Sequence, residues 1–354
     1  MTNFRYVTYT DTIAKNVRTI LVGDIGGTNA NFAFFALEKD TPNLLFSAHA
    51  KSQEIENFTQ VVADVLAYAY QKYAITISNA CFAAAGIVRE DRSLCRPTNA
   101  HFVIDAREIK QKTGLRCVFL VNDFEVIGYG LASLDPCDIV QVKEGTMYHH
   151  SNKAIIGAGT GLGKCVMTWN KALKRHIPVA SEGGHADFAA QNQLEYDLVT
   201  YIKESENWGC TISWEDVLSG NGIKRLYNFF RSRNHDDAAD ADLLQNGLPP
   251  DTIFSNRFRD EHAHNTFLLY TKIYARCAKN FALDALALGG VYIAGGIAAH
   301  NIQLFQEAEF TQEFANCGKQ QALLADIPIF VIADYNVSLY GIIEYMMLEN
   351  LCYS

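Results

Sequence analysis

Two glycine-rich loops, each set between two apolar runs, constrain the fold of this chain more than any other feature. The first reads Gly23-Asp24-Ile25-Gly26-Gly27-Thr28-Asn29 and the second Gly157-Ala158-Gly159-Thr160-Gly161-Leu162-Gly163. Each pattern predicts a strand, a tight turn and a second strand. Because glycine carries no Cβ, successive backbone N–H groups in such a turn can converge on a phosphate group. The pair of loops therefore predicts a nucleotide held between two similar halves of the chain.

Length and charge narrow the class of protein. With 354 residues, of which 49% are hydrophobic, the chain is long enough for two domains with sizeable cores. Acidic residues outnumber basic ones by 39 to 30, which gives a formal net charge of -9. That balance argues against nucleic acid or an anionic membrane as the main partner. A nucleotide site stays open, because it needs only local N–H groups and a cation.

Cysteine usage and apolar runs indicate the compartment. The nine cysteines are scattered and form no Cys-x-x-Cys pair, which indicates a reduced protein without a disulfide framework or structural zinc. The first 17 residues lack the apolar core of a signal peptide, and the apolar stretch 285–299 is too short and too glycine-rich to cross a bilayer. We therefore expect a cytoplasmic protein with no membrane partner.

The order of the expected elements favours an α/β fold in two parts. Apolar spacing predicts helices at 58–73, 194–203, 265–288 and 339–348, with a further helix at 125–131. Buried strands are expected at 78–88, 117–121, 291–294 and 328–332, and surface loops at 232–242 and 247–256. The repetition is between half-chains, since each opens with a glycine hairpin.

Asp24 lies inside the first glycine loop, where its carboxylate would repel a phosphate unless a cation lay between them. Its functional interpretation is a contact to Mg²⁺, direct or through water. The alternative is a turn aspartate that bonds its own backbone. The neighbouring glycines favour the cation contact. Thr28 and Thr160 can each donate a hydroxyl to phosphate, although either alone is more typical of a turn.

Asn122 and Asp123 directly follow a buried strand. Ligands of α/β sheets bind at the carboxyl ends of strands, so Asp123 is well placed as a general base toward an alcohol. The pair equally fits a helix cap before Phe124, and local sequence leaves both open.

Glu182 and His185 lie on a glycine turn, where a carboxylate and an imidazole can converge on a polyol. A metal pair and a histidine satisfied by backbone groups are the alternatives. Glu215 is ambiguous, because Ser213 with Asp216 also fits a helix N-terminus. Gly295 and Gly296 end a strand, where bare backbone could pack against a base or ribose, or simply against another element.

These motifs, in this order, resemble the bacterial-type glucokinase family of the actin/hexokinase-like ATPase superfamily. The matching stretches are Leu-Val-Gly-Asp-Ile-Gly-Gly-Thr-Asn-Ala (21–30), Pro-Thr-Asn (97–99), Val-Asn-Asp-Phe (121–124), Gly-Ala-Gly-Thr-Gly-Leu-Gly (157–163), Glu-Gly-Gly-His-Ala-Asp-Phe (182–188), Glu-Asp-Val-Leu-Ser-Gly (215–220) and Ile-Ala-Gly-Gly-Ile (293–297). Any one of them is weak to moderate, but seven in order are strong. The resemblance covers the chain from about residue 19 to the C-terminal helix.

The resemblance implies a two-domain actin/hexokinase-like ATPase fold, with duplicated ribonuclease H-like α/β domains and a ligand cleft between them. We expect an N-terminal extension at 1–18, a small α/β domain at 19–133 completed by the C-terminal helix 334–354, and a large α/β domain at 134–333. The implied activity is ATP-dependent phosphorylation of glucose at O6. Mg²⁺ is the implied cation, and homodimers are the implied assembly.

Site residues carry over position by position as what the resemblance implies. The sugar site would comprise Asn99, Asn122, Asp123, Glu182, His185 and Glu215, with Asp123 as the base toward the 6-hydroxyl. The phosphates of ATP would be held by Gly23, Asp24, Ile25, Gly26, Gly27 and Thr28 and by Gly159, Thr160 and Gly161. Gly295 and Gly296 would lie on the nucleoside side, and Asp24 would contact the metal.

Three positions depart from the family pattern. Ser181 stands where glycine is expected, Asn221 follows Ser-Gly where Pro-Gly is common, and Lys164 stands where a small apolar residue is usual. None removes a candidate contact. Lys164 would add a positive charge near the phosphates if it points inward.

Three other functions fit part of the sequence pattern but not all of it. A kinase of the repressor/open-reading-frame/kinase group acting on N-acetylated hexoses usually carries a cysteine-rich zinc motif, but Cys210 is the next cysteine after His185 and stands alone. A sugar-sensing regulator would need an N-terminal DNA-binding helix pair, for which the 18 residues before the first expected strand leave no room. A chaperone- or actin-type ATPase fits the loops, but the polar candidates suit a polyol better than a protein surface.

Overall fold

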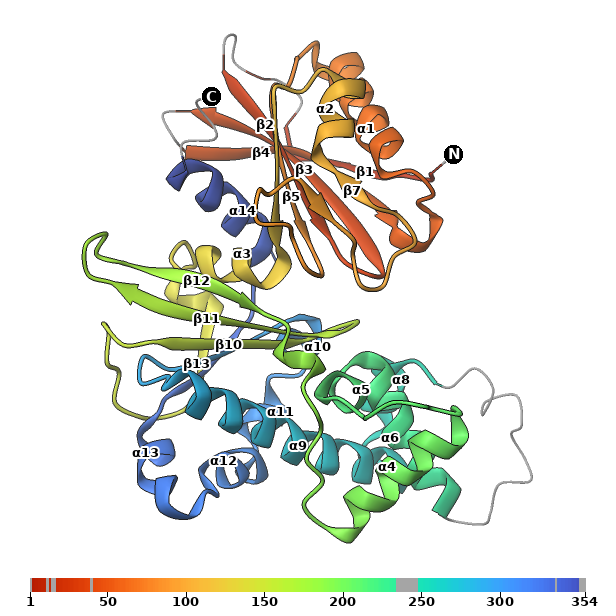
Figure 1. Cartoon of the computed structure of the whole chain (residues 1–354), viewed down its shortest axis with the longest axis vertical. Helices are drawn as coiled ribbons and strands as arrows, with labels where there is room; N and C mark the ends of the chain where they lie inside the picture. The colour runs from red at the N-terminus through yellow and green to blue at the C-terminus, as the bar shows by residue number, and fades with distance from the viewer. Residues whose placement is uncertain are drawn as a thin grey trace. The chain divides into compact units, whose positions relative to one another are not determined.

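The computed structural model describes residues 2–10, 13, 17–38, 41–233, 248–334 and 336–349 (Figure 1). The chain divides into two compact units. The first consists of Met1–Asp135, Ile177–Ala180 and Asn336–Ser354, and the second of Pro136–His176 and Ser181–Tyr335. Each unit contains a six-stranded sheet with helices packed against it.

The sheet of the first unit has the strand order β1-β4-β3-β2-β5-β8. Its β1, β4, β3 and β2 are antiparallel neighbours, whereas β2, β5 and β8 run parallel. The strands are β1 (Arg5–Thr8), β2 (Arg18–Ile25), β3 (Asn29–Glu38), β4 (Thr41–Lys51), β5 (Asn79–Ala84) and β8 (Cys117–Asn122). A small separate sheet joins β6 (Leu94–Cys95) to β7 (Ile104–Asp105). Strand β1 lies in the segment expected as an N-terminal extension, so part of that segment belongs to the sheet.

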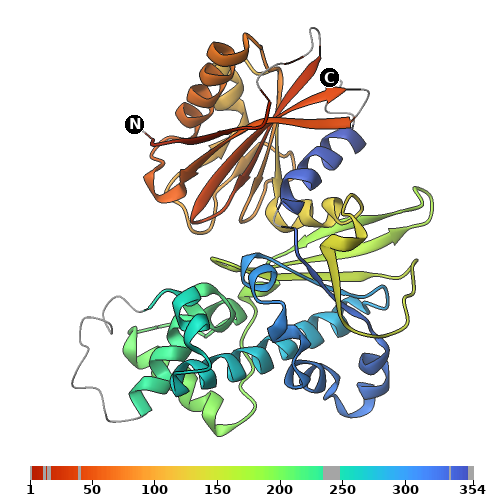
Figure 2. The same cartoon turned by 180° about the vertical axis from the view of Figure 1, so that it is seen from behind.

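Alternating side chains of β2 supply two cores, one on each face of this sheet. Leu21 packs with Val61 and Val62 of α1 (Phe58–Tyr73), on the face that α2 (Ala106–Thr113) also covers. Ile20 and Val22 point to the other face, toward α3 (Asp123–Gly130) and α14 (Val337–Leu348). Figures 1 and 2 show these two helix pairs on opposite faces. The period of two that is typical of strands thus places one helix layer on each side.

Helix boundaries follow from local chemistry. Helix α1 has the predicted bounds, because Asn57 caps it by accepting a hydrogen bond from the Gln60 N–H, and Ala74 ends it in the left-handed region. Helix α3 begins at Asp123, two residues earlier than predicted, because the side chain of Asn122 caps it.

The second six-stranded sheet has the order β12-β11-β10-β13-β14-β9, and it belongs to the second unit except for Ile177–Ala180 of its edge strand β12. Its strands are β9 (Ile139–Lys143), β10 (Lys153–Ala158), β11 (Leu162–Asn170), β12 (Arg175–Ser181), β13 (Val291–Ala294) and β14 (Ile329–Ile332). In both sheets an antiparallel hairpin is followed by two parallel strands added beside the hairpin's first strand. This shared order is the duplication of two α/β halves that the sequence predicts.

Helices of the second unit surround α9 (Glu261–Ala285), whose buried face forms much of the core. The others are α4 (Gln193–Ser205), α5 (Trp214–Leu218), α6 (Gly220–Arg233), α8 (Pro250–Asn256), α10 (Gly296–His300), α11 (Gln303–Gln306), α12 (Ala308–Ala315) and α13 (Gln321–Asp326). The two units together also contain the short 3-10 turns η1 (Ser52–Glu54), η2 (Pro136–Asp138), η3 (Gly183–His185) and η4 (Gly318–Gln320). The surface loop predicted at 247–256 was wrong, because its residues 250–256 form α8, which opens with Pro250 at its first position. Most of the loop predicted at 232–242 lies outside the described residues.

A buried ion network joins three of these helices. Arg276 of α9 donates two hydrogen bonds, of 2.6 and 3.0 Å, to Glu195 of α4, and a third of 3.0 Å to Glu313 of α12. Glu195 is 1% exposed. Removing one partner would leave an uncompensated buried charge, so this network fixes the three helices in one arrangement.

No helix in the described part of the chain combines the length and the apolar character needed to cross a membrane.

Helices α3 and α14 cross at two glycines. A Cβ at Gly341 would overlap the carbonyl oxygen of Val126, and a Cβ at Gly130 would overlap that of Val337. The two backbones are therefore in direct contact, and α14 holds the helix that begins at Asp123.

We expect Gly341→Ala to destabilise the protein by about 2 kcal/mol or more, because the two helices must separate to admit the methyl group. Calorimetry should show a fall in Tm of several degrees, since about 1 kcal/mol corresponds to roughly 2–4 °C in a chain of this size. Gly209→Ala is the matched control, because nothing lies within 4 Å of a Cβ at that position. Equal Tm values for the two variants would contradict the close crossing.

Candidate active site

The first glycine loop joins β2 to β3 and is braced by η1. Ser52 Oγ donates a hydrogen bond to the Gly26 carbonyl oxygen at 2.6 Å, and Gln53 Nε2 donates to that of Gly27 at 3.1 Å. The Ser52 N–H also donates to the Thr28 carbonyl oxygen at 3.0 Å. Residues of η1 therefore hold the carbonyl oxygens of the loop. This arrangement suits a phosphate-binding turn, because a phosphate accepts hydrogen bonds from N–H groups and makes none with carbonyl oxygens.

Besides Asp24, two predicted phosphate-binding residues, Gly23 and Ile25, lie within β2 rather than in the turn. A Cβ at Gly23 would come within 2.7 Å of Phe82 Cδ1, so close packing against β5 accounts for this glycine. The Ile25 side chain is fully buried in the core. Only the backbone of these two residues is available to a ligand.

Asp24 is the penultimate residue of β2 and lies beside α14. Its Oδ2 accepts a hydrogen bond of 2.7 Å from Ser338 Oγ. Burial raises the pKa of the Asp24 carboxyl, and the bond from Ser338 works in the opposite direction. A carboxyl group whose charged form is disfavoured by burial is a candidate for a functional site.

The carboxyl ends of β2, β5 and β8 lie at one edge of the first sheet, because the three strands are parallel neighbours. Asn122 ends β8, and its Oδ1 accepts hydrogen bonds from the N–H groups of Phe124 (2.9 Å) and Glu125 (3.1 Å). Its Nδ2 donates to the carbonyl oxygen of Gly86, just beyond β5, at 3.2 Å. The helix-cap interpretation is thus correct for Asn122, and one Nδ2 hydrogen remains for a ligand.

Asp123 and Asn99 lie at or near this same edge. Asp123 is the first residue of α3 and is partly exposed, and its Oδ1 accepts a hydrogen bond of 3.0 Å from the Phe124 N–H. Asn99 is exposed, and its carbonyl oxygen accepts a hydrogen bond of 3.0 Å from Gln53 Nε2. Gln53 therefore connects the first glycine loop to the segment that carries Asn99.

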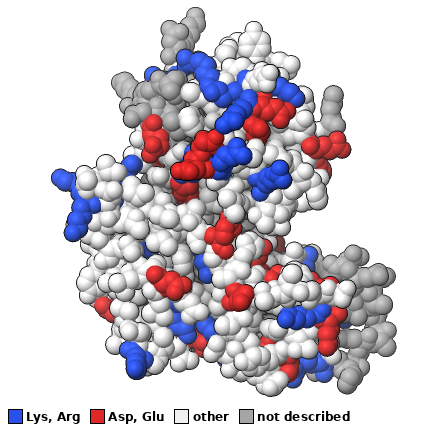
Figure 3. All heavy atoms as spheres, viewed as in Figure 1, with Lys and Arg blue, Asp and Glu red and all other residues white. Residues whose placement is uncertain are grey.

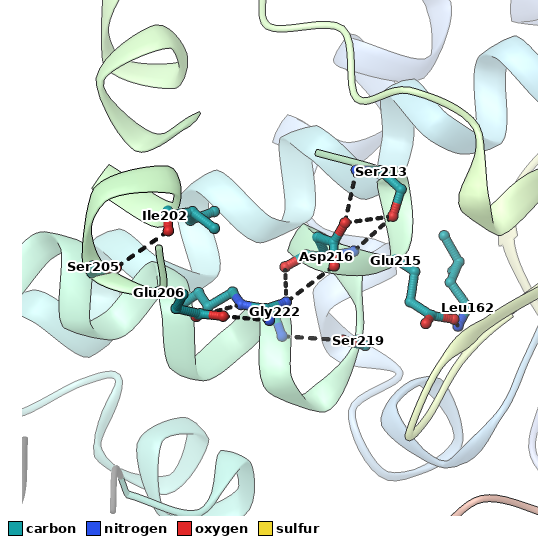
Figure 4. A network of polar contacts seen from close by, with 10 residues as sticks. Leu162, Ile202, Ser205, Glu206, Ser213, Glu215, Asp216, Ser219 and Gly222 are labelled. Atoms are coloured by element: carbon teal, nitrogen blue, oxygen red, sulfur yellow. Dashed lines mark hydrogen bonds and ion pairs between the residues drawn. The ribbon is translucent and has the colours of Figure 1, made fainter. Parts of the chain in front are cut away.

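The second glycine loop joins β10 to β11 and is held by α5 and α6. The Gly159 N–H donates to the Gly161 carbonyl oxygen at 2.8 Å, and the Gly220 N–H donates to the Gly159 carbonyl oxygen at 2.9 Å. Glu215 Oε2 accepts a hydrogen bond of 2.8 Å from the Leu162 N–H (Figure 4). A Cβ at Gly161 would lie 2.5 Å from the same oxygen, so a side chain there would displace the Glu215 carboxylate. Glu215 is therefore a support of this loop, a role that the sequence analysis missed.

Helix α5 owes its position to a capping box. Asp216 Oδ2 accepts a hydrogen bond from the Ser213 N–H at 2.8 Å, while Ser213 Oγ caps the Asp216 N–H. Arg225 of α6 joins Asp216 to Glu206, the residue directly after α4, with bonds of 2.7 and 2.8 Å to Glu206. The helix N-terminus predicted at Ser213 is confirmed, and it presents Glu215 to the loop.

Glu182 precedes the turn η3, and His185 is its last residue. Their side chains are 43% and 44% exposed, and Glu182 Oε2 lies 3.8 Å from His185 Nε2. A Cβ at Gly184 would overlap the Leu162 carbonyl oxygen, so the turn lies against the second glycine loop. The Trp214 N–H donates to the Ala186 carbonyl oxygen at 2.9 Å and joins the turn to α5.

Gly295 touches the same loop from another side. Its φ is +88°, and a Cβ there would lie 2.5 Å from the Ala158 carbonyl oxygen. Gly296 begins α10. The alternative of a close contact between elements is thus correct for Gly295, and it brings the last predicted motif to the second loop.

The second unit therefore gathers Gly159–Gly161, Glu182, His185, Glu215 and Gly295 around one loop. The first unit gathers Asp24, Asn122 and Asp123 along one sheet edge. Acidic and basic side chains are interspersed on the face seen in Figure 3.

The duplicated strand order, with a glycine hairpin opening each half, defines an ATPase of the actin/hexokinase-like class. The glucokinase family model matches residues 21–349. Glucokinase from Nostoc punctiforme is 32% identical over 339 residues, which span 91% of this chain and 97% of that protein. The chain belongs to the glucokinase family.

Solved structures support the fold. The structure of Balamuthia mandrillaris glucokinase in complex with glucose has a TM-score of 0.80 at 23% identity, covering 92% of this chain and 93% of that one. A glucokinase of the ROK family from Streptomyces griseus, in complex with glucose and AMPPNP, has a TM-score of 0.63 at 18% identity and covers 92% of this chain and 98% of that one. The actin/hexokinase-like fold predicted from the sequence is thereby confirmed.

Sequence reasoning missed several supporting residues. Ser338 reaches Asp24 from 314 positions away, and Ser52 and Gln53 reach the first loop from the far end of β4. None of these carries a local motif. For the support of the second loop the sequence offered one signal, Gly220 at the end of the matching stretch 215–220. Its N–H donates a hydrogen bond to the Gly159 carbonyl oxygen.

Replacing Glu215 with Ala should free the loop amide that it holds. We expect hydrogen exchange at the Leu162 amide to rise about tenfold, because a hydrogen bond to a charged acceptor contributes about 1.5–3 kcal/mol. Glu206→Ala is the matched control, since Glu206 belongs to the same network but not to the loop. Unchanged exchange at Leu162 in Glu215→Ala would refute the supporting role.

Asp24→Asn should raise Tm at neutral pH when measured with a chelator and without nucleotide. The folded pKa of Asp24 lies above its unfolded value, so the native state loses stability as pH rises above about 3.9, where the unfolded carboxyl ionises. The advantage of the Asn variant should shrink as pH falls toward that value. A variant less stable than the parent at pH 7 would show that the surroundings favour the charged form.

Proposed function

We propose that this protein is a glucokinase, which transfers the γ-phosphoryl group of ATP to O6 of glucose. The observation that carries the proposal is the position of Asp123, partly exposed at the carboxyl edge of the first sheet, in a chain of the glucokinase family. The glucose and AMPPNP bound in the related structures support a sugar and an adenine nucleotide as the substrates.

Sugar recognition falls to polar side chains that remain accessible. Glu182 and His185 are each nearly half exposed, so they can accept and donate hydrogen bonds to neighbouring hydroxyls. Asn99 is exposed, and Asn122 keeps one amide hydrogen. Glu215 Oε2 already accepts a hydrogen bond from the Leu162 N–H, so Glu215 can offer a sugar only its remaining acceptor lone pairs.

Nucleotide binding falls to the two glycine loops. Both are held from outside, the first through its carbonyl oxygens by η1 and the second by Glu215 and Gly220. Preorganised N–H groups can then meet phosphate oxygens without a further cost of ordering the loop. Gly295 and Gly296 lie beside the second loop on the side proposed for the nucleoside.

Asp24 fits a cation that accompanies the nucleotide. Although Asp24 is partly exposed, desolvation raises the pKa of its carboxyl and disfavours the charged form, and a divalent cation beside it offsets that cost. Mg²⁺ takes one or two protein carboxylates and completes its shell with water and phosphate oxygens, which agrees with a single carboxylate here. When bound, Mg²⁺ neutralises charge on the β- and γ-phosphates.

Asp123 provides the base in the proposed reaction. Its carboxylate orients the 6-hydroxyl and accepts its proton as the bond from O6 to phosphorus forms and the bond from phosphorus to ADP breaks. The proposal draws on residues of both units. It also includes the cytoplasmic location and the homodimeric state that the family resemblance implies, and sedimentation of the purified protein would check the homodimer.

The first experiment is coupled ADP release with glucose, mannose, fructose and N-acetylglucosamine as acceptors. Glucose should give the highest kcat/KM. Preference for N-acetylglucosamine would replace glucose with an N-acetylated hexose, and absence of any sugar-stimulated ADP release would reject the kinase proposal.

Asp123→Ala should lower kcat by about 10²–10⁴-fold, because general-base catalysis contributes in that range. Glucose binding, measured by calorimetry, should persist. Glu261→Ala is the control for removing an acid at the first position of a helix, since Glu261 opens α9 as Asp123 opens α3. A near-normal kcat in Asp123→Ala would overturn the assignment of the base.

A further inference from the structure

The second unit contains a cavity of about 490 Å³ behind the turn that carries Glu182 and His185. Strand β11 contributes Lys164, the turn contributes Ser181 and Gly183, and the last turns of α9 contribute Asn280, Phe281 and Asp284. No residue of the loop Gly157–Gly163 lines it. The cavity is therefore distinct from the proposed phosphate site, and its volume is in the range of about 300–1,000 Å³ that small-molecule pockets occupy.

Lys164 is the unusual group in this lining. The residue is only 5% exposed, and its Nζ lies 5.2 Å from the centre of the Phe281 ring. Cys277 is its other neighbour: burial raises the pKa of this thiol to about 11, and the charge of Lys164 and a hydrogen bond from it oppose the rise. A thiol and a ring face are weak partners for a buried ammonium group.

Two other buried cations of α9 have stronger partners than Lys164. Arg276 is paired with Glu195 and Glu313, and Lys279 donates to the Asn316 carbonyl oxygen at 2.8 Å. Among the residues that the structure describes, the ion pairs do not include Lys164. Because the buried ammonium group of Lys164 has only weak partners, an anion that enters the cavity would stabilise it.

The remaining lining restricts the class of anion. Asp284 is exposed, and its carboxylate accepts hydrogen bonds but repels a second anionic group. Asn280 offers both an amide donor and an acceptor, and the rings of Phe281 and Trp214 offer apolar contact. One cation, one carboxylate and one amide suit a molecule that has a single anionic group and several hydroxyls.

We propose that this cavity binds a small hydroxylated anion of the polyol phosphate type, with its anionic group on Lys164 and its hydroxyls on Asn280 and Asp284.

Occupancy would act on the adjacent turn. A Cβ at Gly183 would lie 3.1 Å from Lys164 Cδ, so the lysine side chain touches the turn between Glu182 and His185. A lysine drawn toward an anion changes its contact with Gly183 and thereby the position of these two side chains. This consequence, a change in KM for glucose, rests on the proposed function, whereas binding to the cavity does not.

The test is calorimetric titration of the full chain, without ATP or sugar, using glycerol 3-phosphate, inorganic phosphate and glycerol as probes. We expect glycerol 3-phosphate to bind more tightly than phosphate, and glycerol not to bind. Lys164→Met should weaken glycerol 3-phosphate binding at least about tenfold, as expected for loss of a charged hydrogen-bond donor. Lys153→Met is the matched control, because Lys153 also lies 5.2 Å from a ring, that of Tyr292, but does not line the cavity.

Equal affinity in the parent and Lys164→Met, or no binding of glycerol 3-phosphate to the parent, would overturn the proposal. Asp284→Asn provides a second route if Lys164→Met does not fold, since Asp284 is exposed. It should reduce the preference for glycerol 3-phosphate over phosphate, and an unchanged preference would also overturn the proposal. A binding-competent protein without sugar-stimulated ADP release would reject the proposed function alone.

Discussion

Backbone contact at glycine is the constraint on which the second unit's loop arrangement depends. The turn at Gly184 lies on the carbonyl oxygen of Leu162, Gly295 lies on that of Ala158, and Gly161 lies on the carboxylate of Glu215. A side chain at Gly184 or Gly295 would push one segment away from the loop 157–163, and one at Gly161 would displace the Glu215 carboxylate. Glycine thus allows a turn, a strand end and a helix to converge on one hairpin, and the polar side chains that they carry converge with them.

The first unit reaches a similar result by topology instead of close packing. Its parallel strands β2, β5 and β8 end at one edge, and each delivers a polar group there: Asp24, the Gly86 carbonyl oxygen and Asn122. The repeated strand order of the two sheets means that the second hairpin occupies the equivalent position to the first. One architecture therefore supports a tightly packed loop in one unit and an open polar edge in the other.

Local patterns in the sequence predicted the elements and motifs, while contacts between distant segments lay beyond them. Helix α1 has its predicted bounds because an Asn cap and helical apolar spacing are both local. Glu215 was left ambiguous, because its bond to Leu162 spans 53 positions and depends on how α5 packs. Lys164 was expected near the phosphates only if it pointed inward. It is instead buried against Phe281, because alternation along β11 turns it toward α9.

Helix α14 makes completion of the first unit depend on a segment that is synthesised late. Its Ile342, Ile343 and Met346 cover the face of the first sheet formed by Ile20 and Val22, and its Ser338 bonds Asp24. The N-terminal sheet is therefore made first but keeps an apolar face uncovered until the last helix leaves the ribosome. All described strands and helices of the second unit precede that helix, so the second unit can complete its core earlier. The half that begins translation is thus the half that finishes folding last.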